Sequence, residues 1–171
     1  NELAMVYDRM NEYANSDKLY SRNLKIAEVK YGGNHIALVD FLGDWGRSYI
    51  AQGKYVKAEE VLMRGLRINE KEFGAGHPSV LSLLEDLASL YGETGRYGES
   101  EAVYQNILKI NKAHPERFNN FSVSRTLGNL GLLYQSMGNL NESEKFLKKS
   151  HDMAVTLLGE NHPEIATSLN N

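Results

Sequence analysis

One residue type, cysteine, is missing from this chain of 171 residues, and several sequence features that mark common functions are missing as well. It has no cysteine, which excludes disulfide bonds, thiolate metal sites and a cysteine nucleophile. The net charge of −3 at pH 7 gives no general reason to expect nucleic acid or anionic lipid as a partner. No apolar run approaches the roughly 20 residues of a membrane span. We therefore expect no nucleic-acid or membrane partner, and a reducing, cytoplasmic location suits the lack of cysteine.

Motifs of catalysis and cofactor binding are also absent. The chain contains no GxxxxGK[ST] phosphate loop, no HExxH and no GxSxG. The stretch "GAGHPS" lacks the last glycine of a dinucleotide loop, and no strand precedes it. Val, Ile and Thr do not cluster in alternating runs, so strands are not expected. The sequence predicts a protein that is not an enzyme and needs no cofactor.

Proline is scarce, and its three positions are informative. Pro78, Pro115 and Pro163 all lie where one periodic stretch gives way to the next. Two of them belong to a recurring phrase, which reads "YGGNHIAL", "FGAGHPSV" and "LGENHPEI". The first two histidines of this phrase, His35 and His77, lie 42 residues apart. Such a recurrence calls for a search for internal repeats.

A period of about 42 residues runs through the whole chain. The sequence from Leu87 to Tyr91, followed by Gly95 and Tyr97, has equivalents one period earlier, two periods earlier and 43 residues later. The second half of the unit repeats as well, as "LYSRNLKIAE", "VLMRGLRINE", "VYQNILKINK" and "FLKKSHDMAV". Agreement of four segments at many positions indicates a repeat protein.

Each repeat is predicted to contain two helices. Apolar residues from Val80 to Tyr91 follow helical spacing, and a second helix from about Tyr97 is expected to end near Asn111 or Lys112. Between the two helices, Gly95 suits the positive φ that often ends a helix. Neither helix can bury its apolar stripe alone, so neighbouring pairs must stack. The expected fold is all-α, an α-α superhelix.

These residues resemble the tetratricopeptide repeat. "LASLYGETGRYGESEAVY" has the family's small residues, tyrosines and turn glycine in their usual order. The repeat length, the "HP" at the helix start and the "LxI" late in the second helix look like the kinesin light chain subtype. The resemblance implies a right-handed solenoid that binds proteins or peptides. One departure is Asn11, which replaces the turn glycine but tolerates the left-handed conformation.

The predicted organisation is a single array over residues 1–171. It comprises a partial repeat 1–34, repeats 35–76, 77–119 and 120–161, and a partial repeat 162–171. One extra residue between Ile110 and Val123 predicts an irregular junction or an extended first helix. The chain begins and stops inside a first helix, so we expect a segment of a longer array. Its uncapped ends also allow head-to-tail self-association.

The histidines of the recurring phrase were considered as metal ligands. His35, His77 and His162 would lie in register along one edge, each at the start of a first helix. Packed helices are ~8–10 Å apart, whereas zinc needs ligand nitrogens at about 2 Å. The histidines therefore cannot share one ion, and we interpret the phrase as a helix-start motif.

A binding surface is predicted on the first helices. About 100° of rotation per residue places the apolar residues of each first helix on one side and polar residues on the other. In tetratricopeptide arrays this second side lines the concave groove. The predicted peptide-binding groove consists of Arg9, Asp40, Asp44, Arg47, Ser82, Asp86, Ser89, Arg125, Asn129 and Leu132.

Two interpretations of these groove residues remain open. Equivalent slots carry Asp44, Asp86, Asn129 and Asn171, a ladder that could bond a peptide backbone, while the arginines could clamp carboxylates. Acidic residues dominate the middle of the predicted groove. This favours a basic or mixed-charge peptide over the C-terminal carboxylate of a chaperone, which would need several lysines or arginines in the groove. Alternatively, the slots are simply solvated helix faces.

Two functions also remain open. One is a scaffold that binds an extended peptide of a protein partner. The other is a regulatory or sensor module of a larger enzyme, an NTPase or a protease.

Overall fold

The computed structural model describes residues 1–115 and 120–158, and helices dominate both ranges. No strand occurs in these two ranges, and the all-α prediction is confirmed. Short 3-10 turns, η1 (Ile36–Leu38) and η2 (Pro78–Val80), precede α3 and α5. The helices are α1 (Glu2–Arg9), α2 (Tyr13–Tyr31), α3 (Val39–Ala51), α4 (Tyr55–Phe73), α5 (Leu81–Glu93), α6 (Tyr97–Ala113), α7 (Asn120–Ser136) and α8 (Leu140–Leu158).

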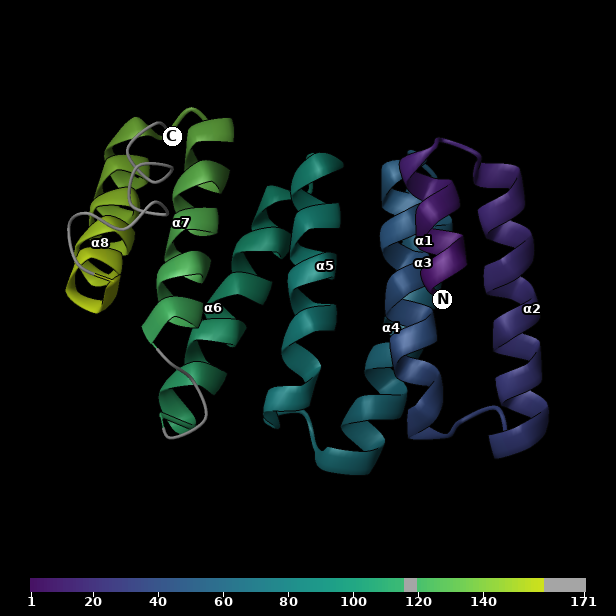
Figure 1. The fold of residues 1–171 in the computed structure, drawn as a ribbon. Helices are drawn as coiled ribbons and strands as arrows, with labels where there is room; N and C mark the ends of the chain where they lie inside the picture. Colours follow the sequence, from purple (N-terminus) through teal and green to yellow (C-terminus); the bar gives the residue numbers. More distant parts are fainter. Residues whose placement is uncertain (116–119, 159–171) are drawn as a thin grey trace. The chain divides into compact units, whose positions relative to one another are not determined.

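The chain forms two compact units, Asn1–Thr94 and Gly95–Asn171. In the first unit, α1 packs on α2 and α3 packs on α4, while α2 contacts α3 and α4 contacts α5. In the second unit, α7 packs along α8 and also contacts α6. Figure 1 shows the paired helices lying side by side. The division into repeats at residues 35, 77, 120 and 162 stays a prediction.

The turns inside the helical pairs have the predicted left-handed backbone. Gly53, Gly95 and Gly138 have φ values of 68°, 75° and 75°, and Asn11 has a φ of 59° at the equivalent position. A side chain is strained in this conformation, which explains why glycine fills three of these turns. The expectation that asparagine preserves the turn is confirmed by Asn11.

The recurring histidines cap the starts of the first helices. The His35 Nδ1 accepts a hydrogen bond from the Ala37 N–H at 3.1 Å, and the His77 Nδ1 accepts one from the Ser79 N–H at 3.2 Å. Each imidazole also stacks on the aromatic residue four positions earlier, as His77 does on Phe73 with ring centroids 4.8 Å apart. The predicted helix-start role is therefore correct for both. His162 lies outside the described residues.

α7 is longer than the other two first helices of complete pairs. It has 17 residues, whereas α3 and α5 have 13 each. The expectation of an extended first helix is thus confirmed. The preceding helix α6 ends at Ala113, one residue beyond the predicted end.

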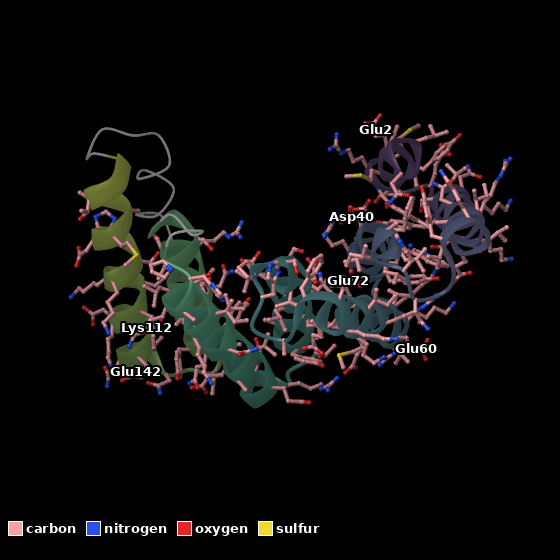
Figure 2. The ribbon with its side chains drawn as sticks, turned by 90° about the horizontal axis from the view of Figure 1, so that it is seen from below. Glu2, Asp40, Glu60, Glu72, Lys112 and Glu142 are labelled. Carbon is pink, nitrogen blue, oxygen red and sulfur yellow. The ribbon has the colours of Figure 1, made fainter. Side chains whose placement is uncertain are left out.

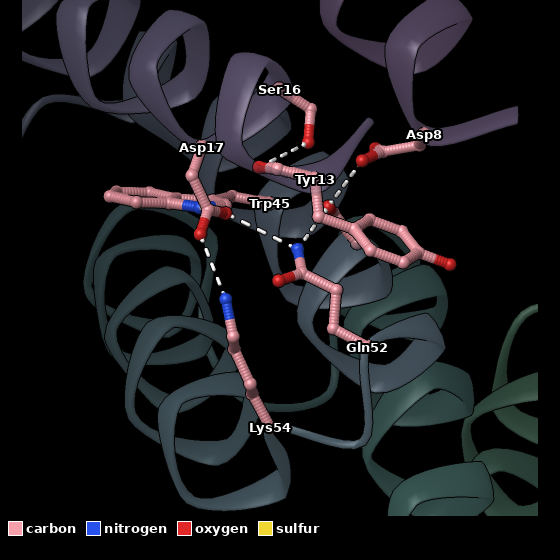
Figure 3. A network of polar contacts seen from close by, with 8 residues as sticks. Asp8, Tyr13, Ser16, Asp17, Trp45, Gln52 and Lys54 are labelled. Carbon is pink, nitrogen blue, oxygen red and sulfur yellow. Dashed lines mark hydrogen bonds and ion pairs between the residues drawn. The ribbon is translucent and has the colours of Figure 1, made fainter. Parts of the chain in front are cut away.

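Neighbouring helical pairs are joined by polar side chains as well as by apolar side chains. Asp17 on α2 accepts hydrogen bonds from the Trp45 Nε1 at 3.3 Å, the Gln52 Nε2 at 3.2 Å and the Lys54 Nζ at 3.0 Å (Figure 3). Burial opposes ionisation, but these donors lower the pKa of Asp17. The network attaches the second helix of one pair to α3 and to the turn between α3 and α4.

A recurring tyrosine adds a second link between pairs. The Tyr91 Oη donates to the Glu59 Oε1 at 3.1 Å in the first unit, and the Tyr134 Oη donates to the Glu101 Oε1 at 2.5 Å in the second. In both cases a first helix bonds to the second helix of the preceding pair. The period that defines the repeat therefore also positions its contacts.

Candidate peptide-binding surface

The predicted groove residues all lie on first helices. We call the described residues of this set the first-helix face: Arg9 of α1, Asp40, Asp44 and Arg47 of α3, Ser82, Asp86 and Ser89 of α5, and Arg125, Asn129 and Leu132 of α7. The part on α1, α3 and α5 belongs to the first unit, and the part on α7 belongs to the second. Each part is described separately.

Arg47 joins two carboxylates of the first unit. Its Nη1 donates to the Asp86 Oδ2 at 2.9 Å, and its Nη2 pairs with the Asp44 Oδ1. The Asn1 Nδ2 donates to the other oxygen of Asp44 at 2.6 Å. Two slots of the predicted Asp/Asn ladder are thus connected through an arginine. Because Arg47 already pairs with these two carboxylates, a carboxylate of a partner would have to compete with them for this guanidinium.

The carboxylate of Asp86 is unusually shielded for a surface acid. Its side chain is 17% exposed, whereas that of Arg47 is 50% exposed. Burial raises the pKa of Asp86 to about 6, against the attraction of Arg47, and the nearby Glu85 and Asp44 carboxylates act in the same direction as burial. The pairing with Arg47 therefore offsets only part of the cost of burying the Asp86 charge.

A small pocket opens beside this cluster, between α1 and α3. Its volume is about 190 Å³, and its lining combines the apolar Met5 and Ala51 with polar and charged side chains. Met5 and Arg9 of α1 and Ala51 of α3 lie at its exposed rim. Asp44 and Arg47 form one wall, which connects the pocket to the cluster. The pocket and the cluster thus form one continuous surface on the first helices.

Polar groups at the floor of the pocket bond to one another. The Tyr20 Oη donates to the Asp8 Oδ2 at 3.0 Å, and the Ser48 Oγ donates to the Asp8 Oδ1 at 2.8 Å. Burial and the Asp8 bond raise the pKa of Tyr20. Asp8 and Tyr20 were not among the predicted site residues, because no other repeat has an aspartate at the position equivalent to Asp8. Helical spacing alone could have indicated that the side chain of Asp8 faces the next helical pair.

The other predicted residues of the first unit are exposed. Asp40, Ser82 and Ser89 are all open to solvent, and the Ser89 Oγ donates to the Glu93 Oε1 at 3.4 Å. In the part of the chain that the structure describes, the Arg9 guanidinium makes no hydrogen bond or ion pair. Arg9 is thus the basic group that this surface offers to a partner.

The second unit carries its own part of the first-helix face. Arg125 is exposed, Asn129 is half-buried, and Leu132 exposes 38% of its surface on α7. The small residues of α7 allow α8 to approach closely, and a Cβ on Gly131 would lie 2.6 Å from the Leu147 Cγ. Asn171, the last slot of the predicted ladder, lies outside the described residues.

A larger hollow lies elsewhere, over α2. Its volume is about 750 Å³, and it is lined by Lys18, Arg22, Lys25 and Ile26 together with Asp17, Ser21 and Trp45. No residue of α1 lines it, so it is separate from the small pocket. Since it is broad and open, it offers little burial to a ligand. It is the competing surface against which the first-helix face must be tested.

Comparison with known proteins establishes the family. Two overlapping matches to a tetratricopeptide repeat profile cover residues 1–71 and 39–113, and a second tetratricopeptide repeat profile matches residues 123–164. The chain belongs to the tetratricopeptide repeat family. Repeats of this family generally act as scaffolds for protein interaction. A comparison with curated protein sequences gives no significant match.

Solved structures show the same fold. A putative kinesin light chain of Podosopora anserina with nearly identical tetratricopeptide-like repeats has a TM-score of 0.81 and 22% identity, with 98% of this chain and 79% of the other covered. A form of that protein with one substituted residue gives a TM-score of 0.82 and 21% identity, with coverage of 98% and 78%. BtubC (BKLC) of P. vanneervenii gives a TM-score of 0.80 and 21% identity, with coverage of 94% and 63%. The predicted solenoid of the kinesin light chain type is confirmed.

Two further observations concern other classes of function. Over residues 1–115 and 120–158, no helix is sufficiently long and apolar to cross a membrane. In the same ranges, no group of three histidine, aspartate or glutamate residues is arranged to hold a metal ion.

Proposed function

We propose that this chain is a non-catalytic scaffold that binds an extended peptide of another protein along the first-helix face. The observation that carries the proposal is the surface of the first unit, where the Asp44–Arg47–Asp86 cluster adjoins a small pocket that also exposes Met5 and Ala51. Polar groups that are fixed by one another can recognise a peptide without the entropic cost of being ordered first. A cytoplasmic location remains part of this proposal.

Charge favours a basic or mixed-charge peptide. Asp40 and Glu93 are exposed, and Arg47, which already pairs with Asp44 and Asp86, is the single arginine on the facing sides of α3 and α5. A lysine or arginine of the peptide would reduce the repulsion among these carboxylates. On the same surface, Arg9 offers one site for an anion. An extended peptide with both signs of charge would match this arrangement.

Peptide display followed by affinity measurement tests the proposal. Peptides selected from a random library on the wild-type chain would be measured by fluorescence anisotropy. The Asp40→Arg, Ser82→Arg double variant changes two exposed residues of α3 and α5 that hold no described bond. We expect it to weaken binding by at least about tenfold, because it adds bulk and positive charge to the surface. Arg47 is unsuitable for this test, since its removal would leave two carboxylates unpaired.

The matched control is Glu60→Arg on α4, an exposed residue of a second helix (Figure 2). It introduces the same side chain without touching the first-helix face, so the affinity should stay within about twofold of wild type. Equal loss in both variants would point to long-range charge rather than to the proposed surface. Unchanged affinity in the double variant would refute the proposal.

A further inference from the structure

The pocket between α1 and α3 has the size of one side chain. Its volume of about 190 Å³ is below the ~300–1,000 Å³ of pockets that hold small molecules. Met5, which is 39% exposed, and Ala51 supply apolar groups at the rim. A partner would therefore insert a single apolar side chain here rather than a cofactor or metabolite.

Most charges around the pocket are already satisfied within the chain. Asp8 accepts bonds from Tyr20 and Ser48, and Asp44 is paired with Arg47. Arg9, at the rim, makes no hydrogen bond or ion pair in the described part of the chain. A guanidinium without a partner among the described residues, beside the apolar side chains of Met5 and Ala51, favours a ligand that carries a carboxylate next to its apolar group.

We propose that this pocket is an anchoring subsite for an aliphatic side chain that is followed by a carboxylate, with Met5 and Ala51 contacting the aliphatic group and Arg9 pairing with the carboxylate. The inference rests on the proposed peptide-binding function and specifies one position of the peptide. The carboxylate is that of the next side chain of the peptide, a glutamate or an aspartate, because the proposed ligand is an extended peptide that carries both signs of charge.

Nuclear magnetic resonance of the methionine methyl groups tests this subsite on the intact chain. The Met5 signal would be assigned with Met5→Leu and followed during titration with four small probes. These are N-acetyl-Leu-Glu-amide, N-acetyl-Leu-Gln-amide, N-acetyl-Gly-Glu-amide and N-acetyl-Gly-Leu with a free carboxylate. We expect Leu-Glu-amide to bind about threefold more tightly than Leu-Gln-amide, as suits an exposed ion pair. If Gly-Leu with its free carboxylate binds best, Arg9 recognises a C-terminus, and the assignment to an acidic side chain is wrong.

Two variants separate the two halves of the subsite. Arg9→Gln should remove the preference for Leu-Glu-amide over Leu-Gln-amide while the residual affinity for both remains. Ala51→Leu fills the mouth from an exposed helix end and should weaken Leu-Glu-amide by about tenfold. The control is Ala14→Leu, which makes the same change at an exposed residue of α2 outside the pocket and should leave both affinities unchanged. Circular dichroism checks that each variant is folded. If Ala51→Leu does not fold, Arg9→Gln still tests the ion pair, and the comparison of the Gly-Glu-amide and Leu-Glu-amide probes still tests the aliphatic anchor.

Three results would overturn the inference. Equal binding of Gly-Glu-amide and Leu-Glu-amide would exclude an aliphatic anchor, and persistence of the preference in Arg9→Gln would exclude the ion pair. The third is the absence of any shift of the Met5 signal with all four probes. After any of these three results, the Asp40→Arg, Ser82→Arg variant shows how far the failure extends. If display-selected peptides bind this variant more weakly than wild type, only the subsite is refuted. If they bind both equally, the proposed peptide-binding function is refuted as well.

Discussion

Replacing Asp86 with asparagine should stabilise the first unit at neutral pH. The Asp86 carboxylate is shielded from water on α5, and burial raises its pKa from the ordinary value of 3.8 to about 6. The attraction of Arg47 is already included in this balance, so the charged form remains disfavoured even with its partner in place. Asparagine imitates the neutral acid and keeps an oxygen that accepts from Arg47.

The magnitude follows from linkage. Because the pKa of Asp86 is higher in the folded chain than in the unfolded chain, the folded state binds more protons between pH 4 and 6. Its contribution to the free energy of unfolding therefore falls as the pH rises through this window and stays low above it. A rise in pKa from 3.8 to about 6 corresponds to at most about 3 kcal/mol.

Urea unfolding from pH 4 to 7.5 measures this effect. Trp45, the single tryptophan of the chain, lies on α3, so its fluorescence reports on the first unit. Asp86→Asn and wild type should have similar unfolding free energies near pH 4. The variant should become more stable by about 1–3 kcal/mol near pH 7. Asp40→Asn, which removes an exposed carboxylate of α3, is the control for the loss of one negative charge.

Two results would refute the reasoning. One is a difference between Asp86→Asn and wild type that does not change between pH 4 and 7. The other is a variant that is less stable than wild type at pH 7, which would mean that the ion pair with Arg47 outweighs the burial of the carboxylate. Either result would remove the argument that Arg47 offsets only part of the cost of burying the Asp86 charge.

Three further substitutions test other parts of the structure. Tyr134→Phe removes the hydrogen bond to Glu101, which together with burial raises the pKa of Tyr134 to about 12. The free energy of unfolding of the wild-type second unit should therefore fall as the pH rises from 10 to 12, and the variant should lose this pH dependence. Gly46→Ala should cost about 1–3 kcal/mol of stability in urea unfolding, because its Cβ would lie 2.5 Å from a methyl group of Leu62. His77→Ala should cost about 1 kcal/mol in thermal unfolding, since it removes the cap of η2.

Each of these three has a matched control. Tyr97→Phe removes a tyrosine hydroxyl from the same unit as Tyr134, and its stability should keep the wild-type dependence between pH 10 and 12. Gly98→Ala places a methyl group in open space on α6 and should not destabilise the chain. His77→Asn retains a capping oxygen and should recover most of the loss of His77→Ala. A His77→Ala variant as stable as wild type would show that the cap is dispensable.

The sequence was sufficient to predict the fold because the information repeats. Positions such as Leu87 and Gly95 recur at a fixed period, so each helix and turn was indicated by several independent segments. The left-handed backbone of the turns was predicted from the glycines at equivalent positions of the repeats, and Asn11 adopts the same conformation. The exact start of α7 could not be predicted, since the extra residue allowed either an irregular junction or a longer helix.

The candidate site was predicted less completely. Helical spacing placed Asp44, Arg47 and Asp86 on the correct helices, but it could not show that Arg47 bridges the two carboxylates. That contact depends on the distance between α3 and α5, which periodicity does not determine. The small pocket was not predicted, because Tyr20 reaches it from a second helix and the predicted groove contained residues of first helices only.

Photo-crosslinking of a display-selected peptide is the most direct test of the central claim. A peptide that carries benzoylphenylalanine at its central position would be irradiated with the wild-type chain, and the attached residues would be identified by mass spectrometry. The proposed function predicts attachment to the first-helix face, at residues near Asp40, Ser82 or Arg9. Attachment to α2 around Lys18 and Lys25, in the larger hollow, would contradict it.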